Sequence, residues 1–134
     1  MPAMETIDVK TTTRSEMIDI TSLVRAAVRR SGISSGLVCV FCPHTTAGVA
    51  IQENSDPQVK SDMVRHLDAL VPREALTTRP DQNSDAHIKG SIIGQSLTVI
   101  VEGGRPQLGN WQAIFFCEFD GPRDRRILIR VLGD

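Results

Sequence analysis

Hydrophobic and polar residues follow two different strand patterns along the chain. Residues 5–13 alternate weakly around Ile7 and Val9, which predicts a strand at the edge of a sheet. The runs 37–42 and 111–119 are apolar at nearly every position, which predicts strands covered on both faces. Shorter apolar runs predict further strands at 47–51, 97–101 and 126–132.

Three segments carry the signals of helices. An apolar stripe within residues 23–28 predicts a first helix, which Gly32 ends. A second helix is expected to begin at Pro57, because proline at the first helical position after a capping residue, here Ser55 or Asp56, is a common helix start. Residues 86–93 predict a short third helix.

The order of these elements indicates the fold class. About six or seven strands and two or three helices, without regular strand–helix alternation, favour an α+β fold with mainly antiparallel sheets packed as a sandwich. A polar stretch at 73–85 predicts a loop. The length of 134 residues suits one domain, so we expect a single domain over 1–134.

Composition and charge narrow the class of partner. Fifteen basic against sixteen acidic residues give a net charge of −1, which argues against a general nucleic-acid binder. Only 4% of the residues are aromatic, so platforms for stacking bases are scarce. The net charge does not exclude a local basic patch.

Cysteine usage and hydropathy indicate a cytoplasmic protein. Cys39, Cys42 and Cys117 lie in apolar runs and are expected to be buried, reduced thiols. The chain has no apolar run of about 18 residues and no apolar leader near its first residue. We therefore expect no membrane partner and no export.

Two histidines stand at the ends of predicted elements. His44 follows a buried strand and precedes Thr45 and Thr46, where an imidazole can act as general base, proton donor or metal ligand. The alternative is that His44 only caps the turn. His87 opens the third helix, a position that favours anion contacts; taken alone, it is equally typical of a surface histidine.

Polar residues around the second helix have two interpretations as well. Asp62 and His66 are four residues apart and share a helix face, which is typical of a solvated contact. Asp62 also adjoins the apolar stripe, so it can point into a cleft. Asn54 opens a segment that caps the helix, and free N–H groups at such a junction can hold a phosphate.

The densest group of charges lies at 118–126, between two predicted strands. Three arginines and several carboxylates, among them Glu118, surround one turn. These residues form either structural salt bridges or an anion pocket, because the arginine fork matches phosphate oxygens.

Several of these segments together resemble the YjbQ-like family, whose members are often labelled secondary thiamine-phosphate synthases. The resemblance spans about 5–133, with its blocks in order. The blocks are 44–49, 53–57, Asp62, 86–89, 94–97, 108–112 and 118–123.

The resemblance implies an α+β fold, a homotrimer and a polar cleft in which the two signature histidines gather. It implies catalytic roles for His44, Asp62, His87 and Glu118. It implies a divalent metal, Zn or Mg, held by His44, His87 and a carboxylate, either Asp62 or Glu118. The ligand contacts that it implies are Thr45, Thr46, Asn54, Gln112, Arg123 and Arg125.

The family label implies a reaction on phosphorylated small molecules. Hydroxymethylpyrimidine diphosphate is joined to a thiazole phosphate with loss of pyrophosphate, as a main or a side activity. Two alternatives are carried with it: a metal-dependent hydrolase of unknown substrate, and a non-catalytic module that binds a phosphometabolite.

Overall fold

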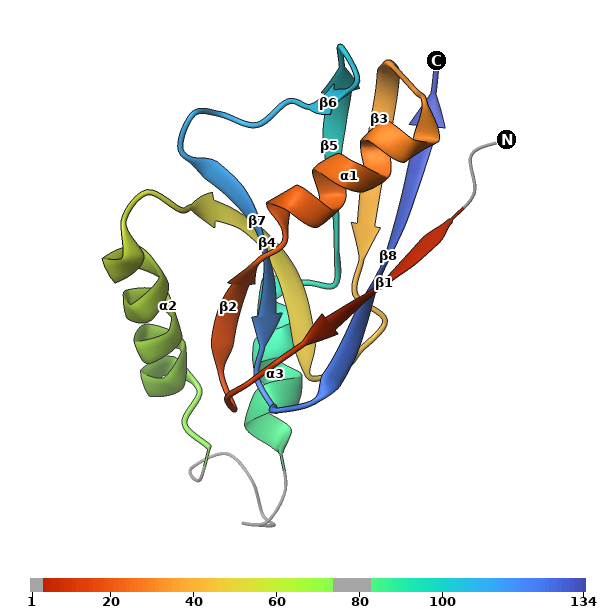
Figure 1. The fold of residues 1–134 in the computed structure, drawn as a ribbon. Helices are drawn as coiled ribbons and strands as arrows, with labels where there is room; N and C mark the ends of the chain where they lie inside the picture. The colour runs from red at the N-terminus through yellow and green to blue at the C-terminus, as the bar shows by residue number, and fades with distance from the viewer. Residues whose placement is uncertain (1–3, 74–82) are drawn as a thin grey trace.

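The computed structural model describes residues 4–73 and 83–134, which form eight strands and three helices (Figure 1). The elements are β1 (Glu5–Lys10), β2 (Glu16–Asp19), α1 (Thr21–Ser31), β3 (Ser35–Phe41), β4 (Ala47–Glu53), α2 (Pro57–Leu70), α3 (Ser84–Ile93), β5 (Ser96–Glu102), β6 (Arg105–Pro106), β7 (Gln112–Glu118) and β8 (Asp124–Gly133).

The strands form two antiparallel sheets. Sheet A has the order β1-β8-β3-β5-β6, and sheet B has the order β2-β7-β4. Every pairing between neighbouring strands is antiparallel. The predicted α+β class with packed antiparallel sheets is therefore confirmed.

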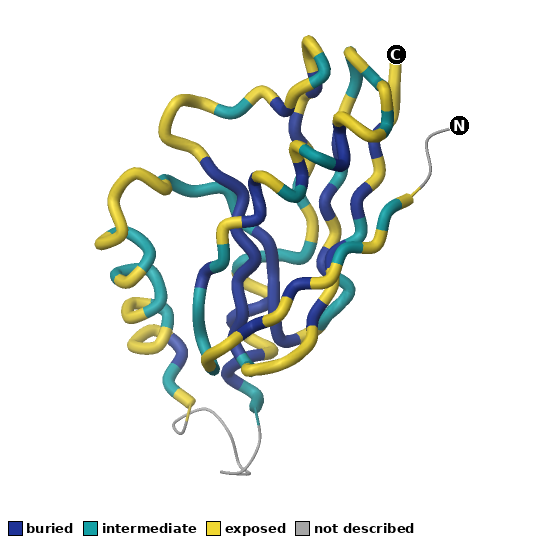
Figure 2. Tube along the Cα trace, viewed as in Figure 1, coloured by how far each residue is buried: buried dark blue, intermediate teal, exposed yellow. Residues whose placement is uncertain are grey.

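The main core lies between the two sheets and helix α1. Side chains from the inner face of sheet A, such as Val38 and Val40, pack in one cluster with Val24 of α1 and Phe116 of sheet B. In Figure 2 strand β7 is buried along most of its length, and β4 is buried at its start. The continuous apolar sequence of β7 follows from this, because a second cluster covers the other face of sheet B.

This second cluster joins sheet B to α2 and α3. Phe115 and Cys117 point to the opposite side of β7 from Phe116, and they pack with Ala86 of α3 and Leu67 of α2. Helix α2 has an apolar stripe but no fully buried residue. It is therefore the outermost layer of this side.

Local sequence patterns predicted the long helices and strands correctly and missed the shortest strands. Asp56 caps α2 as expected, because its side chain accepts a hydrogen bond from the Gln58 N–H at 2.9 Å. Strands β2 and β6 were not predicted, since four and two residues are too few to show a period. Helix α3 begins at Ser84, inside the stretch expected to be a loop; residues 74–82 of that loop lie outside the described residues.

The burial expected for the cysteines is confirmed for two of the three and is wrong for Cys39. Cys42 and Cys117 are buried, whereas Cys39 is half-buried, and all three are free thiols. Within residues 4–73 and 83–134, no helix has the length and hydropathy needed to span a membrane.

Candidate functional site

The end of β3, the turn between β3 and β4, and helix α3 with the residues that follow it line a cleft of about 610 Å³. His44 enters it from the turn, and His87 enters it from the helix. Packing of α3 on β4 brings these two segments together, although they are about forty residues apart in the chain. We call this space the histidine cleft; its lining is Phe41, Cys42, Pro43, His44, Thr45, His87, Ser91 and Gln95.

His44 is held in one orientation by the backbone of β8. Its Nε2 atom accepts a hydrogen bond from the Arg126 N–H at 3.1 Å. The edge of the ring meets Phe116, with 6.4 Å between ring centroids and an interplanar angle of 83°. Partial burial, helped by the positive charge of Arg125, lowers the pKa of His44 below its ordinary value of 6.5.

These contacts determine what His44 can do chemically. A lowered pKa keeps the imidazole neutral at pH 7, and the hydrogen bond to Nε2 assigns the single ring proton to Nδ1. His44 therefore presents an N–H donor rather than a free basic nitrogen. Of the predicted roles, this arrangement favours donation to a ligand oxygen over action as a general base.

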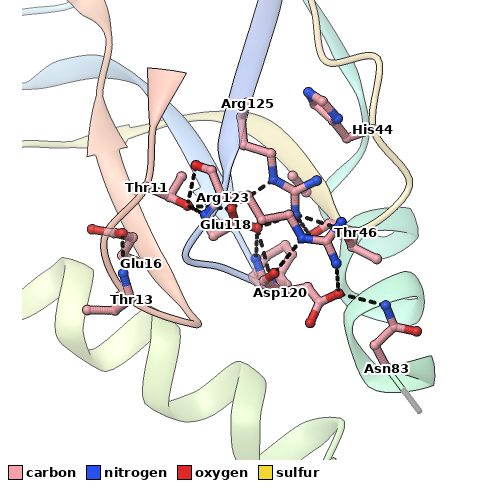
Figure 3. A network of polar contacts seen from close by, with 12 residues as sticks. Thr11, Thr13, Glu16, His44, Thr46, Asn83, Glu118, Asp120, Arg123 and Arg125 are labelled. Atoms are coloured by element: carbon pink, nitrogen blue, oxygen red, sulfur yellow. Dashed lines mark hydrogen bonds and ion pairs between the residues drawn. The ribbon is translucent and has the colours of Figure 1, made fainter. Parts of the chain in front are cut away.

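Glu118, expected in the site, instead lies in a buried ion pair behind it (Figure 3). Its Oε1 atom accepts a hydrogen bond from Arg125 Nε at 2.8 Å and from the Thr11 hydroxyl at 2.7 Å. Its Oε2 atom accepts from Arg125 Nη2 and from two backbone N–H groups, those of Phe119 at 3.0 Å and Asp120 at 3.1 Å. The carboxylate is thus surrounded by donors within the protein.

The same hydrogen bonds determine the protonation of Glu118 and the position of Arg125. Burial alone would raise the pKa of Glu118, but the hydrogen bonds from Arg125 and Thr11 outweigh it and hold the pKa below its ordinary value of 4.5. Arg125 also donates to the Thr46 hydroxyl at 2.8 Å. Glu118, Arg125 and Thr46 are all buried and do not line the histidine cleft, which favours the salt-bridge interpretation of this turn.

Arg123 also binds within its own turn. It forms an ion pair with the Asp120 carboxylate and donates from Nε to the Asp120 carbonyl at 2.9 Å. Asp120 in turn accepts from the Asn83 amide at 2.6 Å, which links the turn to the start of α3 (Figure 3). Arg123 remains exposed, but its side chain does not line the histidine cleft.

Asn54 and Gln112 lie at the opposite end of sheet B from the histidines. In the β4–β7 register Ala47 pairs with Glu118, whereas Glu53 pairs with Gln112. Six residue steps along the strand separate these ends, which corresponds to about 20 Å. The single cleft expected from the resemblance is therefore divided within one chain; Asn54 and Gln112 line a second cleft of about 300 Å³ with Asp19, Thr21, Arg25, Ser55, Asn110, Trp111 and Ala113.

Asp62 does not approach the histidines either. It lies on α2, accepts a hydrogen bond from the Gln58 amide at 3.0 Å and forms an ion pair with Arg65. His66, left out of the predicted site, is exposed on the same helix.

The predicted metal site does not fit this arrangement. Among the described residues, no three His, Cys, Asp or Glu side chains are grouped so as to hold a metal ion. If a metal were bound at Nδ1 of His44, the ring proton would move to Nε2 and face the Arg126 N–H. We therefore derive no step through a metal.

Comparison with known proteins places the chain in a family. Residues 5–134 match the family model described as UPF0047 protein YjbQ-like. The chain belongs to the YjbQ-like family. The UPF0047 protein YugU of Bacillus subtilis is 51% identical over 97% of this chain and 99% of its own length. The UPF0047 protein MJ1081 of Methanocaldococcus jannaschii is 46% identical over 94% of this chain and 91% of its own.

Solved structures of YjbQ-like proteins have the same fold. An uncharacterised conserved protein of the family from Clostridium acetobutylicum has a TM-score of 0.93 and 46% identity, covering 96% of this chain and 99% of its own. A YbjQ-like protein of unknown function from Sulfolobus solfataricus has a TM-score of 0.93 and 28% identity, covering 100% and 99%.

Sequence reasoning missed part of the lining of this YjbQ-like cleft. Ser91 and Gln95 supply a hydroxyl and an amide from α3 and the residue that follows it, and Phe41 supplies an apolar wall. The spacing of His87 and Ser91, four residues on a helix, was a signal that they share a face. Gln95 lies in the block 94–97 of the resemblance, but no spacing along the chain pointed to its place in the cleft.

The buried pair predicts a specific response to acid. Because the pKa of Glu118 is lower in the folded protein, its stabilisation is present above about pH 4.5 and is lost as the pH falls through the folded pKa. Glu118→Gln should lower the free energy of unfolding at pH 7 by about 3 kcal/mol and weaken its dependence on pH below 4.5. Urea unfolding at several pH values measures both effects.

Glu5→Gln is the matched control. Glu5 also binds an arginine, Arg30, but at the surface, with 31% and 55% of the two side chains exposed. Its substitution should change the free energy of unfolding by less than about 1 kcal/mol. Equal losses in the two variants would contradict a buried structural role for Glu118.

Proposed function

We propose that the histidine cleft binds a phosphorylated small molecule and stabilises the negative charge that develops on it by hydrogen-bond donation. The observation that supports this most is that His44 and His87, from two distant segments, line one cleft. Apolar walls with a few convergent polar groups are typical of small-molecule sites. Phe41 and Pro43 supply such walls, and the histidines and Gln95 supply polar groups.

Hydrogen-bond donation fits the state of His44. Its Nδ1–H is the free polar end of a ring whose Nε2 is already occupied by Arg126. A fixed donor of this kind stabilises negative charge that develops on a leaving oxygen. The charge of Arg126 acts on His44, so a cation also lies near this donor.

Within this proposal, thiamine-phosphate synthesis is the named reaction. The bond between the pyrimidine methylene carbon and its diphosphate oxygen breaks, and the thiazole nitrogen forms the new bond to that carbon. His44 would donate to the departing diphosphate, and His87 lies across the same cleft to contact either substrate. The grouping of two imidazoles in one cleft supports this choice; no grouping of described residues supports the metal-dependent hydrolase.

Substitution of the histidines tests the proposal. His44→Ala should lower turnover of hydroxymethylpyrimidine diphosphate and thiazole phosphate by about a hundredfold or more, because loss of one positioned hydrogen-bond donor to a developing oxyanion costs at least that factor. His87→Ala should weaken substrate binding. Steady-state kinetics and thermal shifts with each substrate measure the two effects.

His66→Ala is the control, because this histidine is exposed on α2 and lies outside the cleft. Unchanged turnover in His44→Ala would contradict the catalytic role. Binding of the phosphorylated substrates without any turnover by the unmodified protein would favour the binding module over the enzyme.

We also propose that the chain assembles as a homotrimer through the outer face of sheet A. Leu37 pairs with Ile100 on one side and Leu132 on the other, so their side chains share this face. These three are 44%, 62% and 53% exposed, and within the described residues no helix packs over them. A contiguous exposed apolar patch is typical of a surface that binds another protein.

The outer face continues into the histidine cleft, which favours further copies of this chain as its partner. Phe41 is 42% exposed on this face and also lines the cleft. Copies that bind here would border the mouth of the cleft and shield its ligand from water. The assembly and the proposed activity would then share one surface.

A charge on the apolar face should separate the subunits. Ile100→Glu should reduce the mass measured by light scattering from three times the chain mass of 14.7 kDa to the single value, because a buried unpaired carboxylate opposes association. Leu70→Glu, at an equally exposed apolar residue of α2, should leave the mass unchanged. A mass of 14.7 kDa for the unmodified protein would refute the trimer.

A further inference from the structure

Helix α3 has a charged face on the side away from the histidine cleft. Asp85 and Lys89 are four residues apart and share this face, whereas His87 and Ser91 share the opposite one. Only 1% of the Lys89 side chain and none of the Asp85 side chain is exposed. Buried charges are unfavourable unless they are paired, so their partners define what this face can do.

Two further charged residues form ion pairs with Asp85 and Lys89. Lys89 Nζ lies 2.6 Å from Asp68 Oδ1 of α2 and 3.2 Å from Asp85 Oδ2. Arg14, from the β1–β2 connection, binds both Asp85 oxygens at 3.1 and 3.0 Å. Asp85 is therefore the fixed centre that orients a guanidinium and an ammonium side by side.

A cavity of about 530 Å³ adjoins this group, and none of its lining residues belongs to the histidine cleft. Three cationic side chains and two carboxylates face it, so its charge is positive on balance. We call it the Lys89 cavity; it is lined by Arg14, Ser15, Val64, Asp68, Pro72, Arg73, Asp85 and Lys89.

The two carboxylates of the cavity differ in accessibility. Asp85 is fully buried and is bound by both Arg14 and Lys89. Asp68 is 54% exposed and contacts only Lys89 among the residues just described, from a helix without a fully buried residue. Asp68 is thus the more readily displaced of the two carboxylates, and it occupies a position at which another anion could contact Lys89.

We propose that the Lys89 cavity binds phosphate, with Asp68 as the internal competitor that the anion displaces from Lys89. Arg14 carries five N–H donors and directs two nitrogens at Asp85, which leaves others for the ligand. The hydroxyl of Ser15 and the guanidinium of Arg73 face the same space. Adjacent guanidinium and ammonium groups favour a tetrahedral oxyanion and disfavour a cation.

The competition can be tested by removing one charge. Asp68→Asn should bind inorganic phosphate about tenfold more tightly than the unmodified protein in titration calorimetry at low ionic strength, because the competing carboxylate is gone. Asp62→Asn makes the same change of charge on the same helix, where Asp62 binds Arg65 outside the cavity. It should leave the affinity for phosphate within about twofold.

Two further variants test where the phosphate binds. Arg73→Gln, at an exposed residue of the lining, should weaken phosphate binding to Asp68→Asn severalfold. Arg30→Gln should leave it unchanged, because this exposed arginine lies outside both the Lys89 cavity and the histidine cleft. Equal affinities for Asp68→Asn and Asp62→Asn, or equal weakening by Arg73→Gln and Arg30→Gln, would overturn the proposal.

Discussion

The ion pair between Glu118 and Arg125 is the contact on which the arrangement of the candidate site depends. Glu118 is the last residue of β7 in sheet B, and Arg125 is the second residue of β8 in sheet A. Thr11 and Thr46, which flank strands of the two sheets, bind the same pair. A charge pair of this kind, satisfied by hydrogen bonds on both sides, fixes how the sheets meet at this end.

The position of His44 follows from that constraint. The residue after Arg125 donates its backbone N–H to His44, and the charge of Arg125 helps to keep the imidazole neutral. The ion pair is not itself catalytic here: the carboxylate and the guanidinium act on the site by holding and polarising its histidine. Phe41 lies at the same end of the molecule, where it lines the histidine cleft and is exposed on the outer face of sheet A. The proposed ligand binding and the proposed assembly would therefore be physically linked.

Much of the fold could be predicted from the sequence because its signals are local. The capping of α2 by Asp56 depends only on neighbouring residues. The convergence of His44 and His87 was also expected, although from the family resemblance rather than from spacing. The burial of Glu118 and the separation of Asn54 from the histidines depend on the register of β4 against β7, which spacing along the chain does not specify.

The protonation of His44 tests the central claim most directly. Nitrogen-15 NMR of the imidazole ring distinguishes the two neutral tautomers and follows their titration. We predict a neutral ring at pH 7 with its proton on Nδ1, and a pKa below the ordinary value of 6.5. A ring that carries its proton on Nε2, or that is charged at pH 7, would contradict the account of His44 as a fixed hydrogen-bond donor.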